Sequence, residues 1–136
     1  MAKPEPSPRP FPGLVRRRVA SFGYAFRGVW AALRTEIHLR FHALATVVVL
    51  GLGFYFRLSR LEWALIALAV GLVGSLELMN TAVEAVVNLV SPNYHRLAGR
   101  AKDVAAGAVL VGALAALAVG LLVFGPRVWA LVEVRK

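Results

Sequence analysis

The feature that most constrains this chain is a run of 22 residues, Val104 to Gly125, without a charged side chain. As a helix, such a run can cross the hydrocarbon core of a bilayer, which takes about 20 residues. Two further apolar stretches precede it, at about 41–56 and 63–90. Apolar residues make up 59% of the 136-residue chain, well above the roughly 45–50% of soluble domains. The sequence therefore predicts an all-α membrane protein with three transmembrane helices.

The segment before these spans divides into two parts. Residues 1–13 hold five of the seven prolines and predict a flexible tail. Residues 14–40 carry apolar side chains at spacings of three or four, with arginines largely on other faces of the helix. This pattern predicts a basic amphipathic helix that lies in the membrane interface. The membrane domain is thus predicted to cover residues 14–130, followed by a short tail at 131–136.

The distribution of basic residues predicts the topology. With the N-terminus in the cytoplasm, eleven Lys and Arg would lie inside and five outside, as the positive-inside rule favours. The net charge of +9 fits the same arrangement, because basic residues beside apolar runs contact anionic headgroups. No nucleic-acid partner is expected, and the lack of cysteine excludes disulfides and thiolate metal sites.

The second span contains the unusual polar residues, in the stretch LVGSLELMNTAVEAVVNLV. On a helix, Glu77, Glu84 and Asn88 fall within about 20° of one line, with Asn80 beside it. A carboxylate at the bilayer centre costs at least ~2.5–3.5 kcal/mol on insertion scales. We therefore expect this polar stripe to face a bundle interior or a water-filled cleft rather than lipid.

Helical rise also predicts the depth of the stripe. From Trp63, at the outer edge, Glu77 is about 21 Å further along the helix, which leaves it within about 9 Å of the cytoplasmic edge. Glu84 then lies at that edge. The same membrane surface is expected to hold Glu36, His95, Arg100, Lys102 and Asp103.

Carboxylates and cations at this surface suit chemistry between a lipid headgroup and a soluble reagent. Two carboxylates can hold Mg²⁺, a further carboxylate can take the proton of a lipid hydroxyl, and Lys or Arg can hold phosphates. Phosphoryl transfer from ATP fits these requirements. The alternative is a non-enzymatic membrane protein that uses the stripe for oligomer assembly. A small transporter would need polar residues along the whole span, which the sequence lacks.

Each polar residue also has a purely structural interpretation. Glu77 and Glu84 could pair with basic residues across a bundle, and Asn80 could make an interhelical hydrogen bond. Lys102 and Asp103 could form an ordinary loop ion pair. His95 could be a solvated loop residue or a helix cap.

The order of these residues resembles the signature region of the small bacterial integral-membrane lipid kinases, the prokaryotic diacylglycerol kinases and their undecaprenol kinase relatives. The matching elements are Glu77-x-x-Asn80-Thr-Ala-x-Glu84, then His95, then Ala101-Lys102-Asp103, then Ala108-Val109-Leu110. Residues 21–42 also resemble the amphipathic helix of that family, which ends in a Glu. Together with the three spans, the resemblance covers residues 14–125.

The resemblance implies an ATP- and Mg²⁺-dependent lipid kinase of the bacterial inner membrane, which works as a homotrimer with sites shared between neighbouring subunits. Glu77 would be the catalytic base that acts on the lipid hydroxyl, and Glu36 and Glu84 would bind Mg²⁺. The residues that would bind ATP or order its site are Arg17, Tyr24, Asn80, Asn93, His95, Lys102 and Asp103.

Two positions bear on the branch of the family. Asn88 stands where many members carry Asp. The sequence Glu36-x-x-x-Arg40-Phe41-His42 is more similar to the undecaprenol kinases, because the diacylglycerol enzymes carry an acid near the position of His42. The resemblance therefore favours undecaprenol over diacylglycerol as the lipid alcohol that receives the phosphate.

Overall fold

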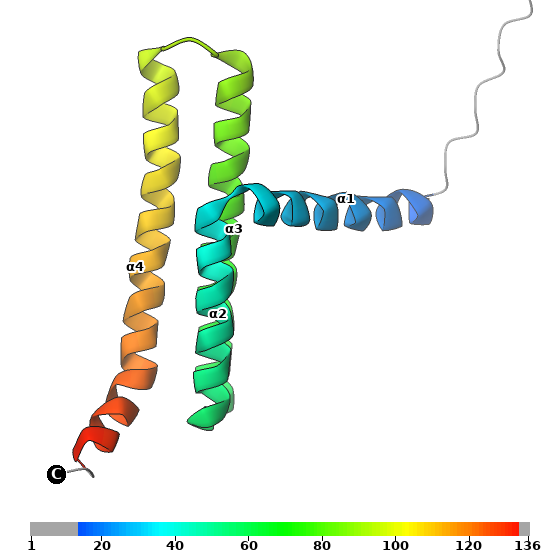
Figure 1. The fold of residues 1–136 in the computed structure, drawn as a ribbon. Helices are drawn as coiled ribbons and strands as arrows, with labels where there is room; N and C mark the ends of the chain where they lie inside the picture. Colours follow the sequence, from blue (N-terminus) through cyan, green and yellow to red (C-terminus); the bar gives the residue numbers. More distant parts are fainter. Residues whose placement is uncertain (1–13, 134–136) are drawn as a thin grey trace, which may run out of the picture. The chain divides into compact units, whose positions relative to one another are not determined.

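The computed structural model describes residues 14–133, with side chains from residue 18 onward. The tail predicted at 1–13 lies outside the described residues. The described residues form four α-helices in the order α1 (Leu14–Thr35), α2 (Ile37–Tyr55), α3 (Arg60–Val90) and α4 (Arg96–Glu133) (Figure 1). The all-helical prediction is confirmed, and α2, α3 and α4 are each long and apolar enough to cross a membrane.

The chain divides into two units, one ending at Ala31 and the other beginning at Ala32. The first unit contains most of α1. Its large apolar side chains are exposed to solvent, among them Phe22, Phe26 and Trp30. Such a helix has exposed apolar surface that lipid can cover. Its position in the membrane interface remains a prediction.

The first helix is shorter than the one predicted for residues 14–40. It is interrupted at Glu36, which has extended backbone geometry (φ −92°, ψ 117°) and is the N-cap of α2. Arg40 stabilises the interruption, because its Nε donates to the carbonyl of Leu33 at 2.9 Å and its Nη2 donates to the carbonyl of Arg34. These carbonyls belong to the last turn of α1, where helical partners are missing.

The turn between α2 and α3 is closed by a capping box. The Ser59 hydroxyl accepts the backbone N–H of Glu62, and the Glu62 carboxylate accepts the backbone N–H of Ser59 at 2.8 Å. Two donors at the start of α3 are satisfied in this way, so α3 begins at Arg60, before the predicted start near Trp63. Arg57 has a left-handed backbone (φ 51°) and reverses the chain.

The last helix extends beyond the predicted span 104–125 at both ends. Pro126 lies inside α4 and does not end it. Proline removes one backbone N–H and crowds the preceding turn, which bends a helix, and the red C-terminal turns of α4 bend in Figure 1. Residues 131–133 of the predicted tail belong to α4, and 134–136 lie outside the described residues.

Helix α3 is the central element of the second unit, because both α2 and α4 pack against it. Each neighbour is joined to α3 by a short turn, so the three helices alternate in direction. A small core of Leu58, Ile66 and Val123 lies near the α2–α3 turn. Most other large apolar side chains of these helices are exposed, as expected for surfaces that contact lipid or other membrane helices.

Candidate functional site

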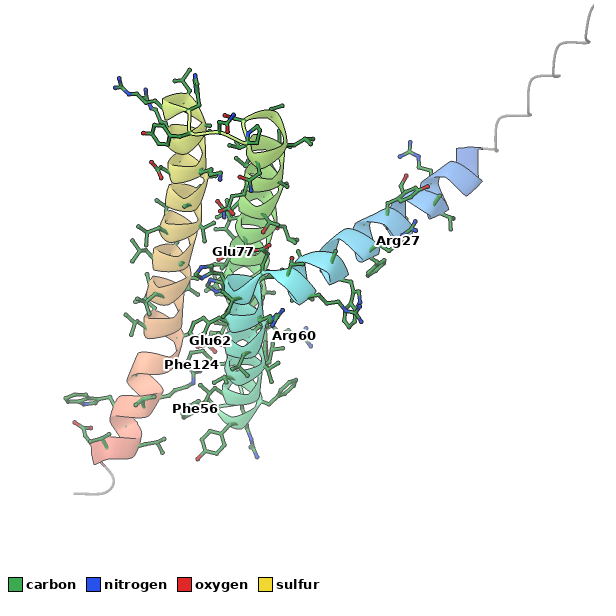
Figure 2. The ribbon with its side chains drawn as sticks, turned by 45° about the horizontal axis from the view of Figure 1, so that its top comes forward. Arg27, Phe56, Arg60, Glu62, Glu77 and Phe124 are labelled. Carbon is green, nitrogen blue, oxygen red and sulfur yellow. The ribbon has the colours of Figure 1, made fainter. Side chains whose placement is uncertain are left out.

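The central contact of the candidate site joins α2 to α3. Among the described residues, Glu77 is the one charged residue that is buried, with 7% of its side chain exposed. Its Oε1 lies 3.1 Å from Nε2 of His42, whose side chain is 30% exposed. Figure 2 shows Glu77 about midway along the bundle, separated from Phe56 and Phe124, which pack against each other nearer the α2–α3 turn.

One turn further along α3, two more polar side chains are in contact. Asn80 Nδ2 donates to Glu84 Oε1 at 2.9 Å, and both residues are half-buried. Asn80 Oδ1 is buried and has no hydrogen-bond partner within the described part of the chain. A buried amide oxygen without a donor is costly. Beside a carboxylate, this oxygen could instead serve as a ligand for a hard cation.

The third acid, Glu36, lies at the start of α2, where it accepts a hydrogen bond from the Thr35 hydroxyl at 3.1 Å. It is six residues before His42, or about 9 Å by helical rise, and Glu84 is seven residues after Glu77, or about 10 Å. Because α2 and α3 run in opposite directions, both shifts lead to the end of the bundle with the α3–α4 turn.

A second polar contact joins α3 to α4 at that end. Lys102 Nζ donates to Asn88 Oδ1 at 2.6 Å. These two side chains, together with Asn93 and His95 from the turn, line a cavity of about 210 Å³. Three of the residues predicted to bind ATP therefore surround one depression.

His95, which lines this cavity, also makes a local capping contact. Its Nδ1 accepts the backbone N–H of Leu97 at 3.3 Å at the start of α4. Asp103 is exposed. The hydrogen bond of Lys102 goes to Asn88, so the Lys102–Asp103 loop pair that the sequence left open is not the contact found for this lysine.

The remaining predicted site residues lie on α1. Tyr24 is exposed, and the Arg27 guanidinium carbon lies 4.7 Å from the centre of its ring, a cation–π contact. The side chain of Arg17 lies outside the described part of the chain. Both residues belong to the first unit, so their role at the site remains a prediction.

An apolar cavity of about 260 Å³ adjoins the His42–Glu77 contact. It is lined by all three bundle helices, with Val49 on α2, Val70 on α3 and Phe124 on α4 among its walls. Among the described residues, His42 and Thr46 are the side chains with polar atoms in its lining. The cavity can therefore accept part of an alkyl or isoprenoid chain, with a polar group at His42.

Sequence reasoning did not include His42 in the site. The signal was present, because an ionisable residue inside an apolar span is a candidate functional residue by default. Its partner could not be identified from helical periodicity, which describes the faces of α2 and α3 separately and not which residues meet across them.

Three apolar helices with a buried acid and a cluster of carboxylate, amide and amine groups toward one end define a small helical membrane protein with a polar site. Residues 23–124 match the family model described as prokaryotic diacylglycerol kinase. The chain therefore belongs to the prokaryotic diacylglycerol kinase family, a family of lipid kinases, and the resemblance seen in the sequence is confirmed.

Relatives in this family carry two different names. The chain is 47% identical to the undecaprenol kinase of Bacillus subtilis over 113 residues, which cover 83% of this chain and 92% of that protein. It is 46% identical to a Synechocystis diacylglycerol kinase over 103 residues, which cover 75% of this chain and 59% of that protein. It is 32% identical to the diacylglycerol kinase of Escherichia coli K12 over 101 residues, 74% of this chain and 83% of that protein.

Proposed function

We propose that this protein transfers the γ-phosphoryl group of ATP to the primary hydroxyl of a membrane lipid, with undecaprenol as the favoured acceptor. The observation that carries the proposal is the buried carboxylate of Glu77, which contacts His42 in the lining of an apolar cavity. The hydroxyl of a lipid whose chain occupies that space would be close to a group able to accept its proton.

We expect the phosphoryl group to pass directly from ATP to the lipid, with Glu77 as the base. Its carboxylate takes the proton of the lipid hydroxyl while the hydroxyl oxygen forms a bond to the γ-phosphorus of ATP. The bond between that phosphorus and the bridging oxygen breaks, and ADP leaves with the electron pair. Burial supports this role, because a site shielded from water strengthens each electrostatic interaction and limits hydrolysis.

The donor atoms near Glu84 suit Mg²⁺, which prefers oxygen ligands. The unpartnered amide oxygen of Asn80 lies beside the Glu84 carboxylate, which is the reason to assign the ion to this place. Glu84 and Glu36 would hold the ion, with phosphate oxygens of the nucleotide completing its shell. When bound, Mg²⁺ neutralises phosphate charge.

ATP is proposed to bind at the α3–α4 turn. Lys102 supplies a positive charge for the phosphates, and Asn93 and His95 line the same cavity. Asn80 orders Glu84 through its hydrogen bond. By the resemblance described above, Asp103, Arg17 and Tyr24 are also proposed to bind ATP or to order its site.

The proposed setting is the bacterial inner membrane, with the N-terminus in the cytoplasm. Helix α1 is proposed to lie in the interface, where its exposed aromatic side chains and arginines suit the boundary between lipid and water. The exposed apolar surfaces of α2–α4 leave room for a homotrimer. Support for undecaprenol comes from the coverage of the relative that bears that name, 83% of this chain against 75% for the Synechocystis diacylglycerol kinase, whereas the two identities, 47% and 46%, are nearly equal.

The test is phosphorylation of undecaprenol and of diacylglycerol in vesicles with labelled ATP. Wild-type protein is expected to label undecaprenol faster. The variant Glu77→Gln should lose turnover while remaining folded, and the control Glu133→Gln, at the far end of α4, should keep it. A wild-type protein that labels neither lipid would contradict the proposal and support a role in assembly.

A further inference from the structure

We propose that His42 is a positioning residue for Glu77, and that it holds the carboxylate in the orientation that accepts the proton of the lipid hydroxyl. The inference rests on the proposed function, because it assigns a role in that reaction. It concerns a residue on α2, whereas the predicted catalytic base lies on α3.

The role proposed for Glu77 decides which atom of the pair would carry the hydrogen. A carboxylate that is to act as a base is ionised and can only accept hydrogen bonds. Nε2 of His42 lies 3.1 Å from Glu77 Oε1, an ion-pair contact in which only the imidazole can be the donor. We infer that this contact engages Oε1 and leaves Oε2 as the oxygen available to a hydroxyl.

The surroundings of Glu77 make this single donor important. In the part of the chain that the structure describes, His42 is the one side chain found in a hydrogen bond or ion pair with the Glu77 carboxylate. A buried carboxylate that loses its donor is destabilised and free to turn away. An acid held by a donor on a neighbouring helix keeps its position only while α2 and α3 stay in register.

His42 also connects this carboxylate to the apolar cavity. His42 lines the cavity, whereas Glu77 does not. A lipid chain in that space would therefore present its polar end to the imidazole and, through it, to the acid. Loss of the imidazole should reduce the rate of the chemical step rather than the binding of nucleotide.

The experiment compares three substitutions of His42 with a matched histidine control. Gln places an amide N–H near the position of Nε2, Asn places it near Nδ1, and Leu provides none. His38 lies four residues earlier on α2 and is exposed, so His38→Leu makes the same chemical change outside the pair. Turnover of undecaprenol and KM for ATP are measured in vesicles, with rates expressed per folded protein from thermal unfolding in detergent.

We expect His42→Leu to lower kcat about 10- to 100-fold, the scale of losses from a misplaced catalytic group, with KM for ATP changed less than about twofold. His42→Gln should recover most of the rate, His42→Asn should not, and His38→Leu should match the wild type. If His42→Leu does not fold, the contrast between Gln and Asn still tests the position of the donor.

An active wild type with fully active His42→Leu overturns the inference alone. Equal rates for the Gln and Asn variants overturn it as well, because a donor at Nε2 would then not matter. A wild type that phosphorylates neither lipid overturns the proposed function and, with it, this inference.

Discussion

Substitution of Gly53 by alanine tests how tightly α2 packs against α3 at the end of the bundle away from Glu77. A Cβ at residue 53 would lie 2.6 Å from Cη2 and 2.9 Å from Cζ2 of the Trp63 indole. Separations this short require one of the groups to move. The indole is also held from another side, because its ring lies 5.0 Å from that of Phe54, centre to centre.

The expected cost follows from these contacts. Overpacking of a filled site costs about 1–3 kcal/mol. Alanine is also a better helix former than glycine by about 1 kcal/mol, which offsets part of that cost. Gly51 provides the matched control, because a Cβ there meets no atom within 4 Å and lies in the same helix. The propensity gain cancels between the two variants, so Gly53→Ala should be less stable than Gly51→Ala by about 1–3 kcal/mol.

The assay is denaturant unfolding in detergent micelles, with lipid phosphorylation measured on the same samples. Gly53 lies about 16 Å along α2 from His42, so kcat per folded protein should not change. Equal unfolding free energies for the two alanine variants would refute the packing argument. A loss of kcat in folded Gly53→Ala would refute the separation of this contact from the site.

Three further predictions concern the turn and the metal ligands. Ser59→Ala removes the hydroxyl of the capping box and should lower the free energy of unfolding by about 1 kcal/mol, measured in the same micelles; an unchanged value would contradict the role of the cap. Arg127→Gln breaks the ion pair with Glu62, whose atoms lie 2.9 Å apart, and should lower the free energy of unfolding slightly. Raising the salt concentration should shrink the difference from wild type, and a difference independent of salt would argue against an electrostatic origin. Asn80→Ala removes both the unpartnered oxygen and the donor to Glu84. The Mg²⁺ concentration for half-maximal kinase activity should therefore rise about tenfold or more, which is the lower end of the losses caused by removing a supporting group at a metal site. An unchanged Mg²⁺ titration would remove Asn80 from the proposed metal site.

Much of the architecture was readable from local patterns. Apolar runs of sufficient length predict three spans because a helix in lipid satisfies its own backbone groups, whatever it packs against. The polar stripe was predictable for the same reason, because α3 is one continuous helix and the angle between Glu77, Glu84 and Asn88 depends only on their spacing. The family was also readable, because its motif lies along a continuous stretch of α3, the turn and α4.

The contacts that give these residues a site needed the tertiary structure. The pairing of His42 with Glu77 depends on the register of α2 against α3, which no single helix encodes. The path of α4 through Pro126 is another case, because Arg127 meets Glu62 across 65 residues of sequence. The interruption at Glu36 was not predicted for a different reason, because the apolar pattern along residues 14–40 does not show that the Arg40 side chain binds the carbonyl of Leu33. The sequence by itself determined which segments are helical and which faces are polar, because both follow from neighbours within a few turns. Only the packed structure decided which polar groups meet, because those distances are set by how separate helices align.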